Sequence, residues 1–174
     1  TVESAAVRRG LRFVAIGAST GGPGAVCELL RCLGGGAGVG IAVVQHIAAG
    51  FENVLAEWLA AECGLDVAVA RDGERLRPGS VRFAPSGGHL LLQPDGSLVV
   101  DRRGPPVNGH RPSVGALFQC LLDHPPGTAA AVLLSGMGTD GAAALLELRR
   151  ANILTIVQDA GSCAVFGMPR AAID

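Results

Sequence analysis

Short apolar segments alternate with amphipathic segments along most of this chain, and this alternation restricts the fold more than any other feature. The apolar segments have the length and the β-branched content that are typical of buried strands. They cover residues 11–16, 39–44, 129–134 and 153–157. The segments with helical spacing cover residues 23–33, 51–63, 113–122 and 142–150. We therefore expect an α/β domain with a doubly wound, mostly parallel sheet and helices on both faces.

The middle of the chain has a different pattern. Short strands are expected at 81–84, 89–93 and 97–101, separated by Pro-Ser-Gly-Gly and Pro-Asp-Gly turns. Asp95-Gly96 is a strong hairpin signal. These features predict an antiparallel hairpin excursion beside the parallel sheet.

Composition and charge limit the chemistry and the partners. All 14 basic residues are arginine and tyrosine is absent, which excludes lysine Schiff bases, a P-loop lysine and a phenolic acid or base. The formal net charge of -1 argues against a nucleic-acid partner, which usually leaves a basic surface. No apolar run approaches the ~18 residues of a membrane span, so we expect no membrane insertion.

The cysteine content predicts a cytosolic protein. The five cysteines are odd in number and form no CxxC pair, which predicts reduced, buried thiols and no zinc site. They are Cys27, Cys32, Cys63, Cys120 and Cys163. The chain begins at Thr1 without methionine, so we expect an excised or processed fragment. Residues 1–10 are expected to be a linker remnant and residues 11–174 a single domain.

Polar residues follow the predicted strands, where open α/β sheets bind their ligands. Ser19 follows the first strand, His46 the second, Asp140 lies in the glycine-rich loop after the third, and Asp159 follows the fourth. Three strand exits thus offer a serine, a histidine and a carboxylate to one edge of the sheet. Histidine is the natural general base for a serine nucleophile.

Each of these residues also has an alternative role. Ser19 lies in a G-x-S-x-G pattern, typical of a nucleophile at a sharp strand-to-helix turn, but residues 17–24 could instead cradle a phosphate. Asp140 could cap the helix that begins at Ala142, and Asp159 is a rival acid. The chain order Ser, His, Asp differs from the Ser, acid, His order of α/β-hydrolases, so a lipase-like enzyme is disfavoured.

Several longer segments resemble one known family. They are VAIGASTGG at 14–22, VVQHIAAGF at 43–51, DGERLRPG at 72–79, GPPVNGHRPSV at 104–114, LLSGMGTDGA at 133–142 and QDAGSCAVFGMPRAAI at 158–173. Together these segments are similar to the catalytic domain of the bacterial chemotaxis receptor methylesterases, the CheB-type enzymes. The resemblance covers nearly the whole chain in order.

The resemblance implies a cytoplasmic serine hydrolase without a cofactor or metal. Its expected substrates are glutamate methyl esters on the cytoplasmic helices of chemoreceptors, with methanol released, and the same chemistry would deamidate receptor glutamines. The family's triad falls on Ser19, His46 and Asp140, and the family places Thr20 and Met137 beside it. We further expect Arg111 and Arg170, the arginines of two matched motifs, to dock the receptor.

Departures from the family and competing functions remain open. Family members usually carry a receiver domain, expected here in the same or another chain, and they continue beyond the last motif, so the C-terminal end could be truncated. Gly109 replaces a residue that is often basic. The alternatives are a serine esterase or amidase on a small molecule, a non-catalytic nucleotide-binding module, and a hydrolase with Cys163 as nucleophile.

Overall fold

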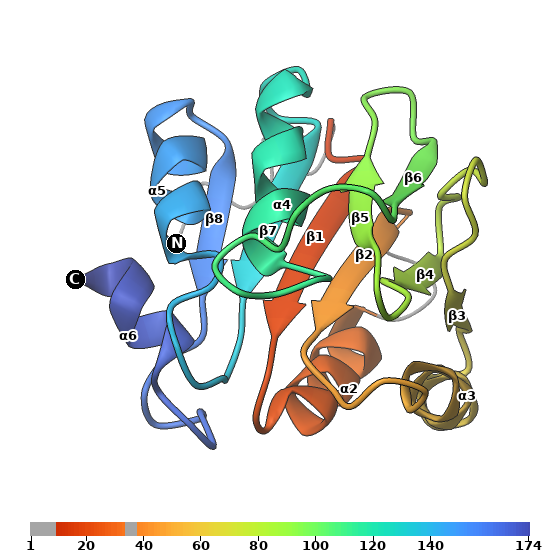
Figure 1. The fold of residues 1–174 in the computed structure, drawn as a ribbon, viewed down its shortest axis with the longest axis horizontal. Coiled ribbons are helices and arrows are strands. Elements are labelled where there is room, and N and C mark those ends of the chain that lie inside the picture. Colours follow the sequence, from red (N-terminus) through yellow and green to blue (C-terminus); the bar gives the residue numbers. More distant parts are fainter. Residues whose placement is uncertain (1–9, 34–37) are drawn as a thin grey trace.

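The structure, a computed structural model, describes residues 10–33 and 38–174. Its main sheet has six parallel strands in the order β3-β4-β2-β1-β7-β8 (Figure 1). The strands are β1 (Phe13–Ala18), β2 (Gly40–Gln45), β3 (Asp66–Val69), β4 (Ser80–Phe83), β7 (Ala129–Leu133) and β8 (Leu154–Val157). Almost all of the linker remnant expected at residues 1–10 lies outside the described residues.

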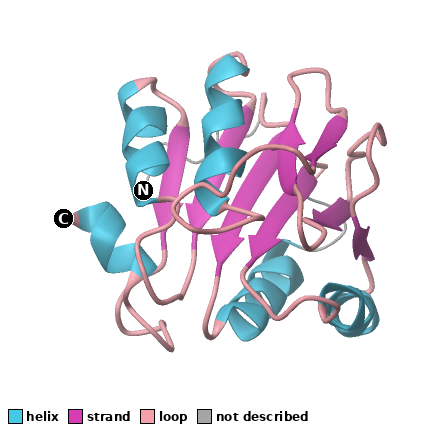
Figure 2. Cartoon of the chain, viewed as in Figure 1, coloured by secondary structure: helices cyan, strands magenta, loops and turns pink. Residues whose placement is uncertain are grey.

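Helices cover both faces of this sheet (Figure 2), as the strand–helix alternation predicts. One face packs against α2 (Gly22–Leu33) and α3 (Glu52–Cys63). The other packs against α4 (Val114–Gln119), the 3-10 turn η1 (Cys120–Asp123), α5 (Ala142–Arg150) and α6 (Met168–Ile173). Every residue of the central strands β1, β2 and β7 is buried, which explains why these segments are apolar except for Gln45 at the end of β2. The expected doubly wound α/β fold is confirmed.

The antiparallel excursion is confirmed in part. β5 (His89–Leu92) and β6 (Leu98–Asp101) pair as an antiparallel hairpin, and Leu90, Leu92 and Leu98 enter the core on the α4 side. The prediction that residues 81–84 belong to this excursion is wrong, because β4 lies in the main sheet, parallel to both β2 and β3. A strand's partner is a long-range choice that its local turn signals do not reveal.

Further differences concern short or exposed elements. The sequence does not predict the edge strand β3, whose side chains are mostly exposed or half-buried, or the six-residue helix α6. Helix α4 ends at Gln119 and continues as η1, rather than running to residue 122. All five cysteines are free thiols, as expected, but only Cys27 is buried; Cys32 is exposed and the other three are half-buried. No helix in the described ranges is both long and apolar enough to cross a membrane.

Substitution of Gly17 tests how closely α4 approaches the sheet. A Cβ at Gly17, in β1, would collide with the side chain of Val114 at the start of α4. We expect Gly17→Ala to destabilise the protein by about 2 kcal/mol, the usual size of an overpacking effect, measured by urea denaturation. Gly24→Ala is the matched control, because a Cβ at Gly24 in α2 meets nothing within 4 Å. Equal stability of the two variants would contradict this packing.

Candidate active site

The ends of β1 and β2 bring Ser19 and His46 together. The two strands pair in register up to Ala18 and Gln45, so the next residue of each chain segment leaves the sheet at neighbouring points. The His46 N–H donates to the Ala18 carbonyl at 2.9 Å. The buried Gln45 amide donates to the carbonyl of Ser19 at 2.7 Å and to that of His46 at 3.0 Å. Gln45, which is not among the site residues predicted from the sequence, therefore joins the two strand exits.

Asp140 lies against the imidazole of His46. Its Oδ2 is 3.0 Å from His46 Nε2, and the side chains are 2% and 14% exposed. The contact has the length of an ion pair but not the direction of a hydrogen bond, since the buried Nε2 has no partner within hydrogen-bonding angles in the described structure. We treat it as a charge contact. The strand-exit prediction that these residues meet is consistent with this position.

The Asp140 carboxylate accepts hydrogen bonds from the beginning of α4. The donors are the Ser113 hydroxyl at 2.8 Å, the Val114 N–H at 2.7 Å and the Gly115 N–H at 3.1 Å. Burial by itself would raise the pKa of Asp140, but the contacts with His46, Val114 and Ser113 outweigh burial and hold this pKa at about 2. The carboxylate is therefore charged at neutral pH.

The alternative prediction that Asp140 caps the helix beginning at Ala142 is wrong, because Asp140 binds a different helix. Asp140 binds the N-terminus of α4, whereas α5 begins after Gly141 without a side-chain cap. A helix N-terminus carries partial positive charge, which stabilises a nearby carboxylate. Ser113, the N-cap residue of α4, lies in the matched segment 104–114, but its contact with Asp140 spans residues distant in sequence, so local patterns do not reveal it.

A second histidine, His110, stacks on His46. The ring centroids are 4.0 Å apart and the planes differ by 13°. Burial lowers the pKa of His110, the charge of protonated His46 lowers it further, and Asp140 opposes both. His110 is not among the site residues that the sequence predicts. The segment GPPVNGHRPSV contains it, but only the tertiary structure places this loop beside His46.

The loop after β7 lies against Ser19. A Cβ at Gly136 would be 2.7 Å from the Ser19 Cβ and would collide with Met168, so a glycine is required for this approach. The Ser19 N–H donates to the Ser135 carbonyl at 3.0 Å, and the Ser135 hydroxyl donates to the Thr20 carbonyl at 2.7 Å. The backbone N–H groups of Thr20 and Met137 donate to no acceptor among the described residues. Both are thus free to bind a ligand oxygen.

A small cavity opens beside these residues. It has a volume of about 160 Å³ and is lined by His46, His110 and Arg111, among others. Ser19 is half-buried, and its hydroxyl makes no hydrogen bond within the described parts of the chain. Arg111 donates to the Gly104 carbonyl at 3.0 Å. Arg170 lies on α6, exposed, 4.0 Å from Asp174. Each of the two candidate docking arginines thus contacts a residue of its own segment.

The structure weakens the other candidate residues. The exposed Asp159 accepts hydrogen bonds from the Ser162 hydroxyl at 2.6 Å and the Gly161 N–H at 2.8 Å, so it forms a local turn. Burial and the negative charge of Asp159 raise the pKa of the Cys163 thiol, the opposite of what a nucleophilic cysteine needs.

His46, His110 and Asp140 also form the group of possible metal ligands in the described residues, with atoms within 4.8 Å of one another. However, the rings of the two histidines are nearly parallel, so their nitrogen lone pairs do not converge on one point. The Asp140 oxygens already accept several hydrogen bonds. The donor set therefore fits proton transfer better than metal binding.

Comparisons with known proteins agree with the resemblance seen in the sequence. The family model described as CheB methylesterase matches residues 14–174. The protein-glutamate methylesterase/protein-glutamine glutaminase 3 of Pseudomonas aeruginosa is 44% identical over 161 residues, which are 92% of this chain and 48% of the relative. The corresponding enzyme of Bordetella pertussis is 46% identical over 93% of this chain and 47% of its own length. The chain spans about half the length of the curated relatives it matches.

A solved structure has the same fold. The crystal structure of the Thermotoga maritima CheB methylesterase catalytic domain is similar, with a TM-score of 0.87 and 34% sequence identity, over 94% of this chain and 87% of that chain. The shared fold thus includes nearly all of the described structure.

Asp140→Asn tests the role of the buried carboxylate. In Asp140→Asn, the amide nitrogen of the new side chain would face N–H or O–H donors at the beginning of α4 that now bind a carboxylate oxygen. Buried N–H groups would then lack an acceptor. We expect a loss of about 2–3 kcal/mol of unfolding free energy, measured by urea denaturation. Asp159→Asn, in its exposed turn, is the control and should cost less than about 1 kcal/mol. A similar loss in both variants would contradict the assigned role of Asp140.

The pH dependence of stability provides an independent test. The folded-state pKa of Asp140 is about 2, below the 3.8 of an unperturbed aspartate, so its charge stabilises the folded state fully above about pH 4. This contribution is lost as the pH falls toward 2. The difference in unfolding free energy between the unaltered protein and Asp140→Asn should therefore shrink over this interval. A difference that stays constant from pH 5 to pH 2 would contradict the lowered pKa.

Proposed function

Because the chain belongs to the CheB methylesterase family, we propose that it is a serine hydrolase that demethylates glutamate methyl esters on bacterial chemoreceptors. The reaction releases methanol and restores the carboxylate. Deamidation of receptor glutamines is included in the proposal, since both reactions form the same glutamyl ester with serine. The names of the relatives, which combine methylesterase and glutaminase, support this pairing. We further propose that the domain works in the cytoplasm, with a receiver domain of the same or another chain as regulator.

The observation that carries this proposal is that the backbone of His46 is bonded next to the Ser19 exit while its imidazole contacts the buried, charged Asp140. Because His46 Nε2 faces the carboxylate, Nδ1 is the nitrogen that accepts the Ser19 proton. The Ser19 oxygen then attacks the ester carbonyl carbon, and Asp140 stabilises the imidazolium that forms. The distance between His46 and Asp140 suits this role. We expect the two groups to align into a hydrogen bond when substrate binds.

The remaining steps of the reaction use groups at the same carboxyl edge of the sheet. The oxyanion is bound by the free N–H groups of Thr20 and Met137, whose stabilising effect is usually worth ~10²–10³ in rate per donor. The bond between the carbonyl carbon and the methoxy oxygen breaks, and protonated His46 gives its proton to the leaving methoxide. Water then attacks the acyl-serine with His46 as base, which releases the glutamate carboxylate and regenerates Ser19.

Ser19→Ala tests the nucleophile. We expect methanol release from methylated receptor to fall to background, because no other hydroxyl replaces the Ser19 nucleophile. Ser97→Ala, in the turn before β6, is the control and should retain activity. A serine-directed inhibitor should label Ser19, as mapped by mass spectrometry, with no labelling in the variant. Methanol release by Ser19→Ala at the unaltered rate would refute the assignment.

A comparison of substrates separates the receptor esterase from a small-molecule esterase. We expect the chain to hydrolyse a methylated receptor fragment with a much higher kcat/KM than p-nitrophenyl acetate, since part of the binding energy comes from the polypeptide. The measurement is the ratio of the two values under one set of conditions. An enzyme that hydrolyses the small ester and ignores the receptor would support the alternative function.

In this proposal Arg111 and Arg170 contact the receptor during docking. Arg111 lines the cavity beside His46, and Arg170 lies on the exposed side of α6. We expect the double variant Arg111→Ala/Arg170→Ala to raise the KM for methylated receptor by about tenfold, since each exposed ion pair is worth up to ~1 kcal/mol. Receptor demethylation that is unchanged in this variant would remove both residues from the proposal.

A further inference from the structure

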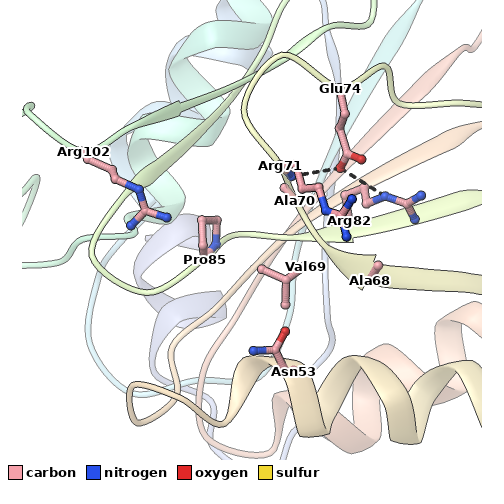
Figure 3. Close-up of a pocket in the computed structure, with 9 residues that line it drawn as sticks. All are labelled: Asn53, Ala68, Val69, Ala70, Arg71, Glu74, Arg82, Pro85 and Arg102. Carbon is pink, nitrogen blue, oxygen red and sulfur yellow. Dashed lines mark hydrogen bonds and ion pairs between the residues drawn. The ribbon is translucent and has the colours of Figure 1, made fainter.

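A second cavity lies farther along the same edge of the sheet, where β3 and β4 end (Figure 3). It has a volume of about 540 Å³, and its lining includes Arg71, Glu74, Arg82, Arg102 and Asn53 of α3. None of the residues assigned to the reaction lines it. Three of its lining residues are arginines, in a chain whose formal net charge is -1. The lining therefore carries three guanidinium groups and one carboxylate, that of Glu74.

Arg82 forms a fixed part of the cavity wall. Its guanidinium lies 2.9 Å from Asp66 Oδ2 and 3.1 Å from Glu74 Oε1, and the side chain is 14% exposed. The Glu74 oxygen also accepts the Arg71 backbone N–H at 3.1 Å, and Figure 3 draws both of these Glu74 contacts. Two carboxylates thus neutralise Arg82, so its charge is not available to a ligand.

Arg71 and Arg102 supply the available charge. Both residues are exposed. The side chain of Arg71 has no hydrogen-bond or ion-pair partner in the described ranges, and Arg102 donates only to the Ser86 carbonyl, at 3.3 Å. The neighbouring carboxylates are held by backbone N–H groups, Asp72 by Val100 and Asp101 by Arg103 and Gly104. Two guanidinium groups therefore remain to bind a carboxylate, for which their planar geometry is well suited.

The cavity adjoins the one beside His46, because consecutive residues of one segment line the two. The segment 84–86 separates the two cavities: Ala84 and Ser86 line the one beside His46, and Pro85 lines this one. In the sheet order, β3 is two strands from β2 and three from β1. At the usual strand spacing, the ends of these strands are about 10–15 Å apart. This span corresponds to two to three turns of an α-helix, about 7–10 residues.

We propose that this cavity binds an acidic side chain of the receptor polypeptide, two to three helical turns away from the glutamate ester that Ser19 attacks. The inference rests on the proposed function and adds to it a second point of contact. The occupant follows from charge complementarity with Arg71 and Arg102 and from the position of the cavity along the edge that the polypeptide would follow. Charge contacts of this kind orient the bound partner and raise the rate at which the two molecules associate, in addition to raising affinity.

Binding to a chain that cannot turn over tests the proposal. In the Ser19→Ala background, Arg71→Ala/Arg102→Ala should raise the Kd for a methylated receptor fragment about fivefold, since each exposed pair is worth up to ~1 kcal/mol. Arg71→Glu/Arg102→Glu should raise it more, through repulsion. Arg149→Ala/Arg150→Ala, in the last turn of α5, is the matched control and should bind like the Ser19→Ala chain. The measurement is fluorescence anisotropy of the labelled fragment.

A second receptor fragment identifies the occupant. Its acidic residues two to three turns from the esterified glutamate are changed to glutamine. This change should weaken binding to the Ser19→Ala chain by the same factor, with no further loss in Arg71→Ala/Arg102→Ala, because the two changes remove one interaction. The proposal would be overturned if Arg71→Ala/Arg102→Ala weakened binding of both fragments by the same factor. It would also be overturned if this variant bound the unaltered fragment as tightly as the Arg149→Ala/Arg150→Ala control does.

Methanol release by the unaltered chain keeps this test separate from the test of function. If the unaltered chain demethylates the receptor and the Arg71/Arg102 variants bind it like the control, only the docking inference fails. If the chain neither binds nor demethylates the receptor, both proposals fail.

Discussion

The buried carboxylate of Asp140 is the interaction on which the candidate site depends. It joins three segments that are far apart in sequence: the loop after β7, the N-terminus of α4 and His46 at the end of β2. A buried charge is tolerated only when donors surround it, and here the N–H groups of α4 and the Ser113 hydroxyl supply them. The arrangement that satisfies this charge also keeps the carboxylate ionised and places it against the imidazole.

Close approach of backbone segments brings the rest of the site to the same edge. Gly136 lets the loop after β7 contact Ser19, and Gly17 lets α4 pack on β1. A Cβ at Gly22 would likewise collide with the Gln45 side chain, which holds the carbonyls of both strand exits. The site is thus built on buried central strands with little room for adjustment. The surface that would meet a polypeptide lies at the ends of β4 and of the more exposed edge strand β3.

Most elements of the fold could be predicted because their apolar periodicity is strong. The central strands and α2, α3 and α5 lie within one or two residues of the predicted bounds. The errors occur where side chains are only partly buried, or where pairing with a distant strand determines which sheet a segment joins. Strand β3 is mostly exposed or half-buried and was not predicted, and β4 joins the parallel sheet although the turn after it suggested a hairpin. Neither outcome is encoded in a local pattern.

For the site, the sequence by itself determined which side chains leave the sheet at its carboxyl edge. Strand periodicity and glycine positions point to Ser19, His46 and Asp140, and the family resemblance favours Asp140 over Asp159. Only the tertiary structure decided what surrounds them: His110 stacked on His46, Ser113 bound to Asp140, and the arginine-lined cavity beyond β4. The physical reason is that strand exits follow from local backbone patterns. Side-chain contacts between loops depend on the packing of helices and strands that are distant in sequence.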